Sequence, residues 1–179
     1  MISVFLSYPQ PHMVAQQKFI TVINNYLVDR GFSPRTLGVT DYDMDAPLTT
    51  IRRLMLESNG LITVAFRRAY IEKGQGKLNS DLGSKQYNIS GQWLTSPYCH
   101  IEPAMAFQLG LPILILRETG VLADGILEKG VTGTYLPEFD LSNDPDNYLC
   151  SSEWLQIIGK WEGYLRKVAE TKGCPPKLY

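Results

Sequence analysis

The sequence is poor in the residue types that build metal centres and disulfide frameworks. Its 179 residues include three cysteines, Cys99, Cys150 and Cys174, and two histidines, His12 and His100. An odd number of widely spaced cysteines fits neither a disulfide framework nor a metal-ligand pattern. Two histidines are too few for a histidine-rich metal site. We therefore expect neither a bound metal ion nor a cofactor.

The sequence also lacks a surplus of positive charge and a long apolar run. Its 17 Lys and Arg are set against 18 Asp and Glu, for a net charge of −1. Without a basic surplus to hold a phosphate backbone, nucleic-acid binding is not predicted. No stretch is apolar for long enough to span a membrane. The first residues, 1–6, lack the basic start and long apolar core of a signal peptide, so we expect a cytoplasmic protein without a membrane partner.

Short apolar runs alternate with amphipathic segments along the chain. Strands are predicted at 2–7, 32–37, 61–66, 111–116 and, shorter, 134–136. Helices are predicted at 12–30, 47–58, from the segment around 102 to Gly110, at 121–129 and at 152–171. Alternation of this kind predicts an α/β fold, a five-stranded parallel sheet with helices on both faces.

The chain length indicates a single domain, residues 1–179, with a core of about 2–140 and a C-terminal helix of about 152–171. That last helix carries an apolar stripe, which we predict to be core. The stripe consists of Trp154, Ile158, Trp161, Leu165 and Val168. Residues 72–92 are rich in Gly, Lys, Ser, Asn and Gln and have no sustained period, so we predict a long excursion close to the cleft. Residues 140–146 are predicted to form a loop, and residues 172–179 a tail.

Glu102 is the carboxylate that stands out. A helix N-terminus favours negative charge, so an ordinary helix-start glutamate explains its position. Its neighbours are nevertheless aromatic and poor in cations, because Tyr98 lies one turn earlier and Cys99 lies between them. A carboxylate in such surroundings, beside the edge of a sheet, is also a candidate catalytic acid or base.

Two further groups of residues follow predicted strands. Tyr8, Pro9 and Gln10 follow the first strand, and ligands of open α/β sheets bind outside the carboxyl ends of the strands. Arg67-Arg68 follows the third strand, and such a pair either meets a phosphate or is simply solvated.

The alternating aspartates Asp41, Asp43 and Asp45 are typical of a calcium loop, but the glycine and the distal glutamate of the helix-loop-helix calcium motif are missing. A solvated loop beside the cleft is the other interpretation of this segment.

Two separated segments resemble one family. The opening Val4-Phe5-Leu6-Ser7-Tyr8 is similar to the first strand of Toll/interleukin-1 receptor (TIR) domains. The central Ser96-x-Tyr98-Cys99-x-x-Glu102 resembles the family's Ser-x-Trp-Cys-x-x-Glu. The resemblance covers roughly residues 2–117 and implies the flavodoxin-like TIR fold.

The enzymes of this family cleave NAD+ at the nicotinamide–ribose bond. The resemblance implies that Glu102 is the catalytic glutamate of an NAD+ glycohydrolase or ADP-ribosyl cyclase, with NAD+ as substrate. We expect Tyr8, Pro9, Ser96 and Tyr98 to bind that substrate. The resemblance also implies that the stretch 38–47 is the loop that rearranges when TIR domains assemble, so we expect a homo-oligomer.

The sequence departs from the family pattern in several places. Tyr98 replaces the usual Trp, and Phe66 stands where a serine is common. The excursion 71–95 is longer than in typical members. No arginine follows Tyr8, which leaves the phosphate contacts unassigned.

Three functions remain open. The first is NAD+ cleavage to nicotinamide and ADP-ribose or a cyclic ADP-ribose, in bacterial antiphage defence and with a separate effector that responds to the cyclic product. The second is a nucleoside 2-deoxyribosyltransferase-like enzyme, whose related fold also uses a glutamate ahead of a Gly-x-Pro-apolar strand such as Gly110-Leu111-Pro112-Ile113. The third is a non-enzymatic TIR adaptor.

Overall fold

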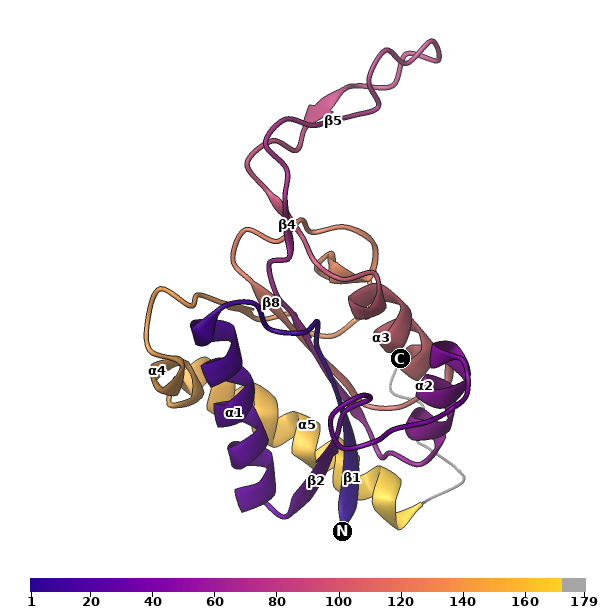
Figure 1. The fold of residues 1–179 in the computed structure, drawn as a ribbon, viewed down its shortest axis with the longest axis vertical. Helices are drawn as coiled ribbons and strands as arrows, with labels where there is room; N and C mark the ends of the chain where they lie inside the picture. The colour runs from indigo at the N-terminus through magenta and orange to yellow at the C-terminus, as the bar shows by residue number, and fades with distance from the viewer. Residues whose placement is uncertain (172–179) are drawn as a thin grey trace.

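The computed structural model describes residues 1–171, and within that range five strands form one parallel sheet (Figure 1). They are β1 (Ile2–Ser7), β2 (Phe32–Arg35), β3 (Leu61–Ala65), β8 (Ile113–Glu118) and β9 (Glu138–Phe139). Their spatial order is β2-β1-β3-β8-β9. This is the flavodoxin-like order 2-1-3-4-5, so the predicted five-stranded α/β fold is confirmed.

Helices cover both faces of the sheet (Figure 1). On one face lie α1 (Val14–Asp29), the short α4 (Pro145–Leu149) and α5 (Ser152–Glu170), and on the other lie α2 (Pro47–Leu56) and α3 (Tyr98–Gln108). None of the helices found within residues 1–171 combines the length and the apolar character that crossing a bilayer requires.

The two-residue period of the strands divides the core into two clusters. In β1, Val4 and Leu6 pack with α1 and α5, whereas Phe5 packs with α2 and α3. Burying one large apolar side chain contributes about 1.5–3 kcal/mol, so these clusters account for much of the stability of the sheet. The predicted stripe on α5 is buried throughout, from Trp154 to Val168.

The predicted excursion is a projecting arm, residues 69–94 (Figure 1). Two short antiparallel ladders stiffen it. One pairs β4 (Ala69–Tyr70) with β7 (Trp93–Leu94), and the other pairs β5 (Gln75–Gly76) with β6 (Tyr87–Asn88). At its base the rings of Tyr70 and Trp93 lie 5.0 Å apart.

The predictions for three segments after residue 120 were wrong. The helix expected at 121–129 is only a 3-10 turn, η1 (Gly125–Leu127), and the strand expected at 134–136 is β9 at Glu138–Phe139. Phe139 fixes this register because it is buried and stacks on Phe19 with ring centroids 4.2 Å apart.

The segment 140–146 was expected to be a loop, but α4 begins within it. The side chain of Asp144 caps this helix by accepting from the N–H of Asp146, and Pro145 takes the first helical position, where its missing N–H costs nothing. The predicted tail, 172–179, and Cys174 lie outside the described residues.

Candidate active site

The candidate site lies where β1 ends and α3 begins, at the carboxyl edge of the sheet. A cavity of about 340 Å³ opens there. Its lining brings together the expected catalytic residue and the four expected substrate-binding residues. These are Tyr8, Pro9, Ser96, Tyr98 and Glu102. The two matching motifs, almost ninety positions apart in the chain, therefore face one space.

Glu102 is the fifth residue of α3, and 7% of it is exposed. Its Oε2 accepts a short hydrogen bond from the hydroxyl of Ser7. Burial raises the pKa of Glu102 to about 7, although the Ser7 hydrogen bond acts in the opposite direction. Desolvation penalises the charged form, and here it outweighs any benefit from the helix N-terminus. The carboxyl group is thus close to half ionised at neutral pH.

Aromatic side chains flank this carboxyl group. Tyr8 follows β1 and is half-buried, and burial raises its pKa. Tyr98 begins α3 and is partly exposed at the mouth of the cavity. The hydroxyl of Ser96 accepts from the Tyr98 N–H at 3.3 Å, which fixes the start of the helix. Flat apolar surfaces beside one buried carboxylate suit a planar ring and a sugar.

Cys99 and His100 are not brought together as a nucleophile and base. Cys99 lines the cavity but is 1% exposed, and burial raises the pKa of its thiol to about 12. Its sulfur lies 3.8 Å from the carbonyl oxygen of Val64. His100 instead lines a separate cavity with Asp124. A thiolate mechanism is therefore disfavoured at neutral pH.

Ser7 is the important residue that sequence reasoning passed over as a site residue. It belongs to the opening motif, and its neighbours signal its direction. Along β1, Phe5 points to the face of α2 and α3, so the two-residue period sends Ser7 to the same face. That face carries Glu102.

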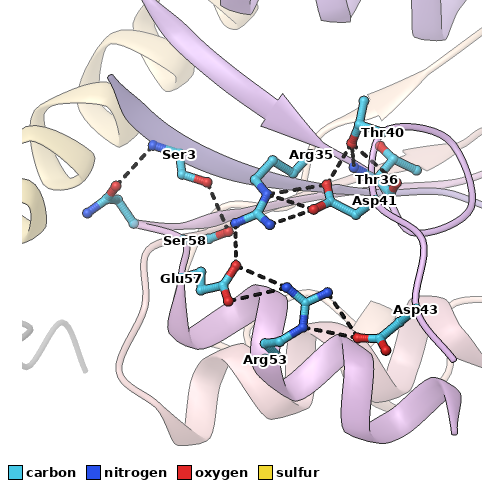
Figure 2. Close-up of polar contacts among 10 residues, drawn as sticks. Ser3, Arg35, Thr36, Thr40, Asp41, Asp43, Arg53, Glu57 and Ser58 are labelled. Atoms are coloured by element: carbon cyan, nitrogen blue, oxygen red, sulfur yellow. Dashed lines mark hydrogen bonds and ion pairs between the residues drawn. The ribbon is translucent and has the colours of Figure 1, made fainter. Parts of the chain in front are cut away.

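One wall of the cavity comes from the loop between β2 and α2, and two aspartates of this loop form ion pairs with arginines of β2 and α2 (Figure 2). Arg35 holds Asp41 at 2.5 Å and Glu57 at 2.7 Å, and Arg53 bridges Glu57 at 3.2 Å and Asp43 at 3.0 Å. We call these five residues the paired cluster. Two of the three alternating aspartates thus serve as partners of arginine.

The ends of this loop contact the site directly. Leu37 and Pro47 line the cavity together with Ile51 of α2. The hydroxyl of Thr36 also donates to the carbonyl oxygen of Leu6, which joins the loop to β1 beside Ser7. The paired cluster therefore holds a wall of the site in place.

The arm does not form part of this cavity. In the part of the chain that the structure describes, no residue between 71 and 94 lines it. The arm leaves the sheet near the site but projects away from it (Figure 1).

Fold and cavity together define a flavodoxin-like α/β protein in which the carboxyl group of Glu102 lines a cavity at the carboxyl edge of the sheet. Neither a scan against protein-family models nor a search of curated proteins finds a match. Solved structures that resemble the chain include the following two. The CMP N-glycosidase BcmB of Clostridium botulinum is 16% identical with a TM-score of 0.51, over 87% of this chain and 98% of that chain.

The second structure is that of the TIR domains of the activated Roq1 resistosome, which directly recognises the pathogen effector XopQ. It is 13% identical with a TM-score of 0.43, over 95% of this chain and 84% of that chain. At 16% identity, the likeness to BcmB concerns the fold alone.

Proposed function

We propose that the protein cleaves the N-glycosidic bond of a nucleotide, with NAD+ as the substrate and Glu102 as the catalytic carboxylate. The burial of Glu102 in a cavity with aromatic walls carries this proposal. The matching motif around it adds support, and so does a fold shared with an N-glycosidase.

The reaction requires little from the protein beyond one well-placed carboxylate. As the bond to the ribose breaks, positive charge develops on the sugar in an oxocarbenium-like transition state. The Glu102 carboxylate stabilises that charge, and a poorly hydrated cavity strengthens the effect. In the same position it can accept hydrogen bonds from the ribose hydroxyls.

The leaving group distinguishes NAD+ from other nucleotides. Nicotinamide is already cationic in NAD+ and departs as a neutral molecule, so it needs no proton from an acid. A cytosine leaving group is neutral and gains from protonation. Among the described residues that line the cavity, Glu102 is the sole carboxyl group. A single carboxylate therefore favours NAD+.

Nucleotides such as CMP form the second candidate class, because a CMP N-glycosidase shares the fold. A Glu102 with a pKa of about 7 is partly protonated at neutral pH and can supply a proton to such a base. A deoxyribosyltransferase would instead form a covalent sugar adduct on Glu102.

The decisive experiment incubates NAD+ with the wild type, Glu102→Gln and Glu170→Gln at high protein concentration, and measures released nicotinamide by chromatography and mass spectrometry. The Gln side chain keeps the size of Glu102 and an acceptor for Ser7, but it cannot carry charge. We expect a rate loss of about a thousandfold for Glu102→Gln and little change for Glu170→Gln, which removes an exposed carboxylate at the end of α5, outside the cavity. Turnover by Glu102→Gln at the wild-type rate would contradict the proposal.

The same assay separates the other candidates. ADP-ribose and cyclic ADP-ribose among the products distinguish attack by water from attack within the molecule. CMP in place of NAD+ tests the second class, and intact mass after incubation with a deoxynucleoside detects an adduct. Absence of turnover on every substrate would favour an adaptor.

The biological setting belongs to the proposal too. We propose that the protein acts in the cytoplasm in bacterial antiphage defence, with a separate effector if the product is cyclic. We also propose that TIR–TIR contacts assemble it into homo-oligomers. Specific activity should then rise with protein concentration, and a constant specific activity down to low nanomolar protein would count against assembly.

A further inference from the structure

A second cavity adjoins the site and differs from it in charge. It has a volume of about 520 Å³ and shares Pro9, Gln10 and Ser96 with the lining of the Glu102 cavity. Its other lining residues are Pro11, His12 and Arg68. The two cavities are therefore neighbours, and Glu102 lines one while the nitrogen donors Arg68 and His12 line the other. We call the second space the Arg68 cavity.

The consecutive residues Arg67 and Arg68 have different environments. The Nε of Arg67 donates to the carbonyl oxygen of Thr119 at 2.6 Å and lies 3.7 Å from Glu118, while its guanidinium lies over the ring of Trp93. Within residues 1–171, the guanidinium of Arg68 has no hydrogen-bond or ion-pair partner, although its backbone N–H donates to the carbonyl oxygen of Leu94 at 2.9 Å. The backbone of Arg68 is therefore held by a hydrogen bond, while its guanidinium group is available to a ligand.

A buried glutamine joins the two sides of the Arg68 cavity. Gln16 of α1 is 2% exposed, and its Oε1 accepts from the backbone N–H of His12 at 3.1 Å. Its Nε2 donates to the carbonyl oxygen of Arg67 at 3.1 Å and reaches Glu118 at 3.3 Å. A fully bonded buried amide holds its neighbours firmly. Gln16 thus fixes the His12 loop relative to the backbone that carries Arg68.

We propose that the Arg68 cavity binds a phosphate group of the substrate whose ribose lies against Glu102. The planar guanidinium of Arg68 presents a fork of donors that matches phosphate oxygens. His12 supplies a second donor from the opposite wall. The inference rests on the proposed function and narrows it. The substrate class is a nucleoside 5′-phosphate or a dinucleotide pyrophosphate, and a free nucleoside is a poor substrate.

The kinetic test compares substrates with and without phosphate. KM and kcat are measured for NAD+ against nicotinamide riboside, and for CMP against cytidine, on the wild type, Arg68→Gln and Arg52→Gln. Arg52 is an exposed arginine on α2 outside both cavities and serves as the matched control. We expect Arg68→Gln to raise KM for the phosphorylated substrate roughly 10- to 100-fold, with kcat little changed. Its constants for the phosphate-free partner should match those of the wild type. Equal losses on both substrates, or none on either, would overturn the subsite.

A binding measurement separates this inference from the proposed function. Calorimetric titration with ADP-ribose and with CMP needs no turnover. We expect Arg68→Gln to weaken binding of a phosphorylated ligand by the same 10- to 100-fold, and Arg52→Gln to leave it unchanged. Phosphate-dependent binding without any cleavage would overturn the proposed reaction but support the subsite. Binding that is unaffected by Arg68→Gln, or absent from the wild type, would overturn the subsite itself.

Discussion

Two groups of charged side chains around the same cleft differ in whether they form ion pairs. In the paired cluster, Arg35 and Arg53 are matched with Asp41, Asp43 and Glu57, and the pairs are partly exposed at the surface (Figure 2). On the cleft side, neither Glu102 nor Arg68 forms an ion pair with any residue in the range that the structure describes.

The difference separates charges that hold the fold from charges that are available to a ligand. Paired charges near the surface lose little solvation and fix a loop at low cost. A buried carboxylate without a cation lowers stability whenever it is ionised, because its charge is desolvated and uncompensated. Such an arrangement is typical of functional sites. The following changes test this contrast.

The largest expected effect concerns stability. Burial shifts the pKa of Glu102 from its ordinary value of 4.5 to about 7, so the folded state binds the proton more tightly than the unfolded state. Stability therefore falls as pH rises from about 4.5 through about 7. Glutamine resembles the protonated form, so Glu102→Gln should exceed the wild type by about 3 kcal/mol at pH 8 and by little at pH 4.5. Urea unfolding across this range measures the difference.

Glu57→Gln is the matched control for that experiment. The hydrogen bond from Arg35, followed by that from Arg53, lowers the pKa of Glu57. Its contribution is present at neutral pH and is lost as pH falls through the lowered pKa, which is the opposite sign. A pH-independent difference between Glu102→Gln and the wild type would refute the cost assigned to the buried charge.

A smaller loss is expected inside the paired cluster. Asp41→Asn removes the charge from the better buried of the pairs, in which Arg35 contacts both carboxylate oxygens. Charged hydrogen bonds of this kind contribute about 2 kcal/mol. Arg53→Gln, at a more exposed pair, should cost clearly less. Thermal unfolding of both variants measures the two costs, and equal losses would mean that burial does not rank these pairs.

The smallest expected effect concerns Ser7, whose hydroxyl donates a hydrogen bond to the carboxyl group of Glu102. Ser7→Ala removes the hydrogen bond that lowers the pKa of Glu102, so that pKa should rise further. If the carboxylate is the active form, nicotinamide release increases through a midpoint near pH 7 in the wild type and at a higher pH in Ser7→Ala. Ser3→Ala, on the same strand but bonded to Ser58, should leave the midpoint unchanged. An unshifted midpoint in Ser7→Ala would exclude Ser7 as a regulator of Glu102.

The sequence predicted the sheet well because alternating apolar segments leave few other arrangements. The placement of Tyr8 and Glu102 in one cavity also followed from the rule that strand ends meet at one edge. The ionisation of Glu102 was not predictable, since the helix-start position suggested a stabilised charge and only the packing around α3 reveals its burial. No feature of the sequence distinguishes the environment of Arg67 from that of Arg68 either. Their difference arises from Glu118 and Thr119, about fifty residues away.

The last strand shows a different limit. Local composition favoured 134–136, but the sheet selects Glu138–Phe139, because Phe139 reaches Phe19 across the core. A two-residue strand has too little pattern of its own to fix its position. Such edges are set by one long-range packing contact.

The arm has a consequence for how this chain can change over time. Ala69 pairs with Leu94, so the polypeptide leaves the sheet and returns to it at the same place. The residues beyond the pairing of β4 with β7, 71–92, can grow, shrink or be exchanged without moving β3 or α3. The join between Arg68 and Ser96 is therefore a natural insertion point, at which evolution or an engineer can attach a new recognition element beside an unaltered cleft.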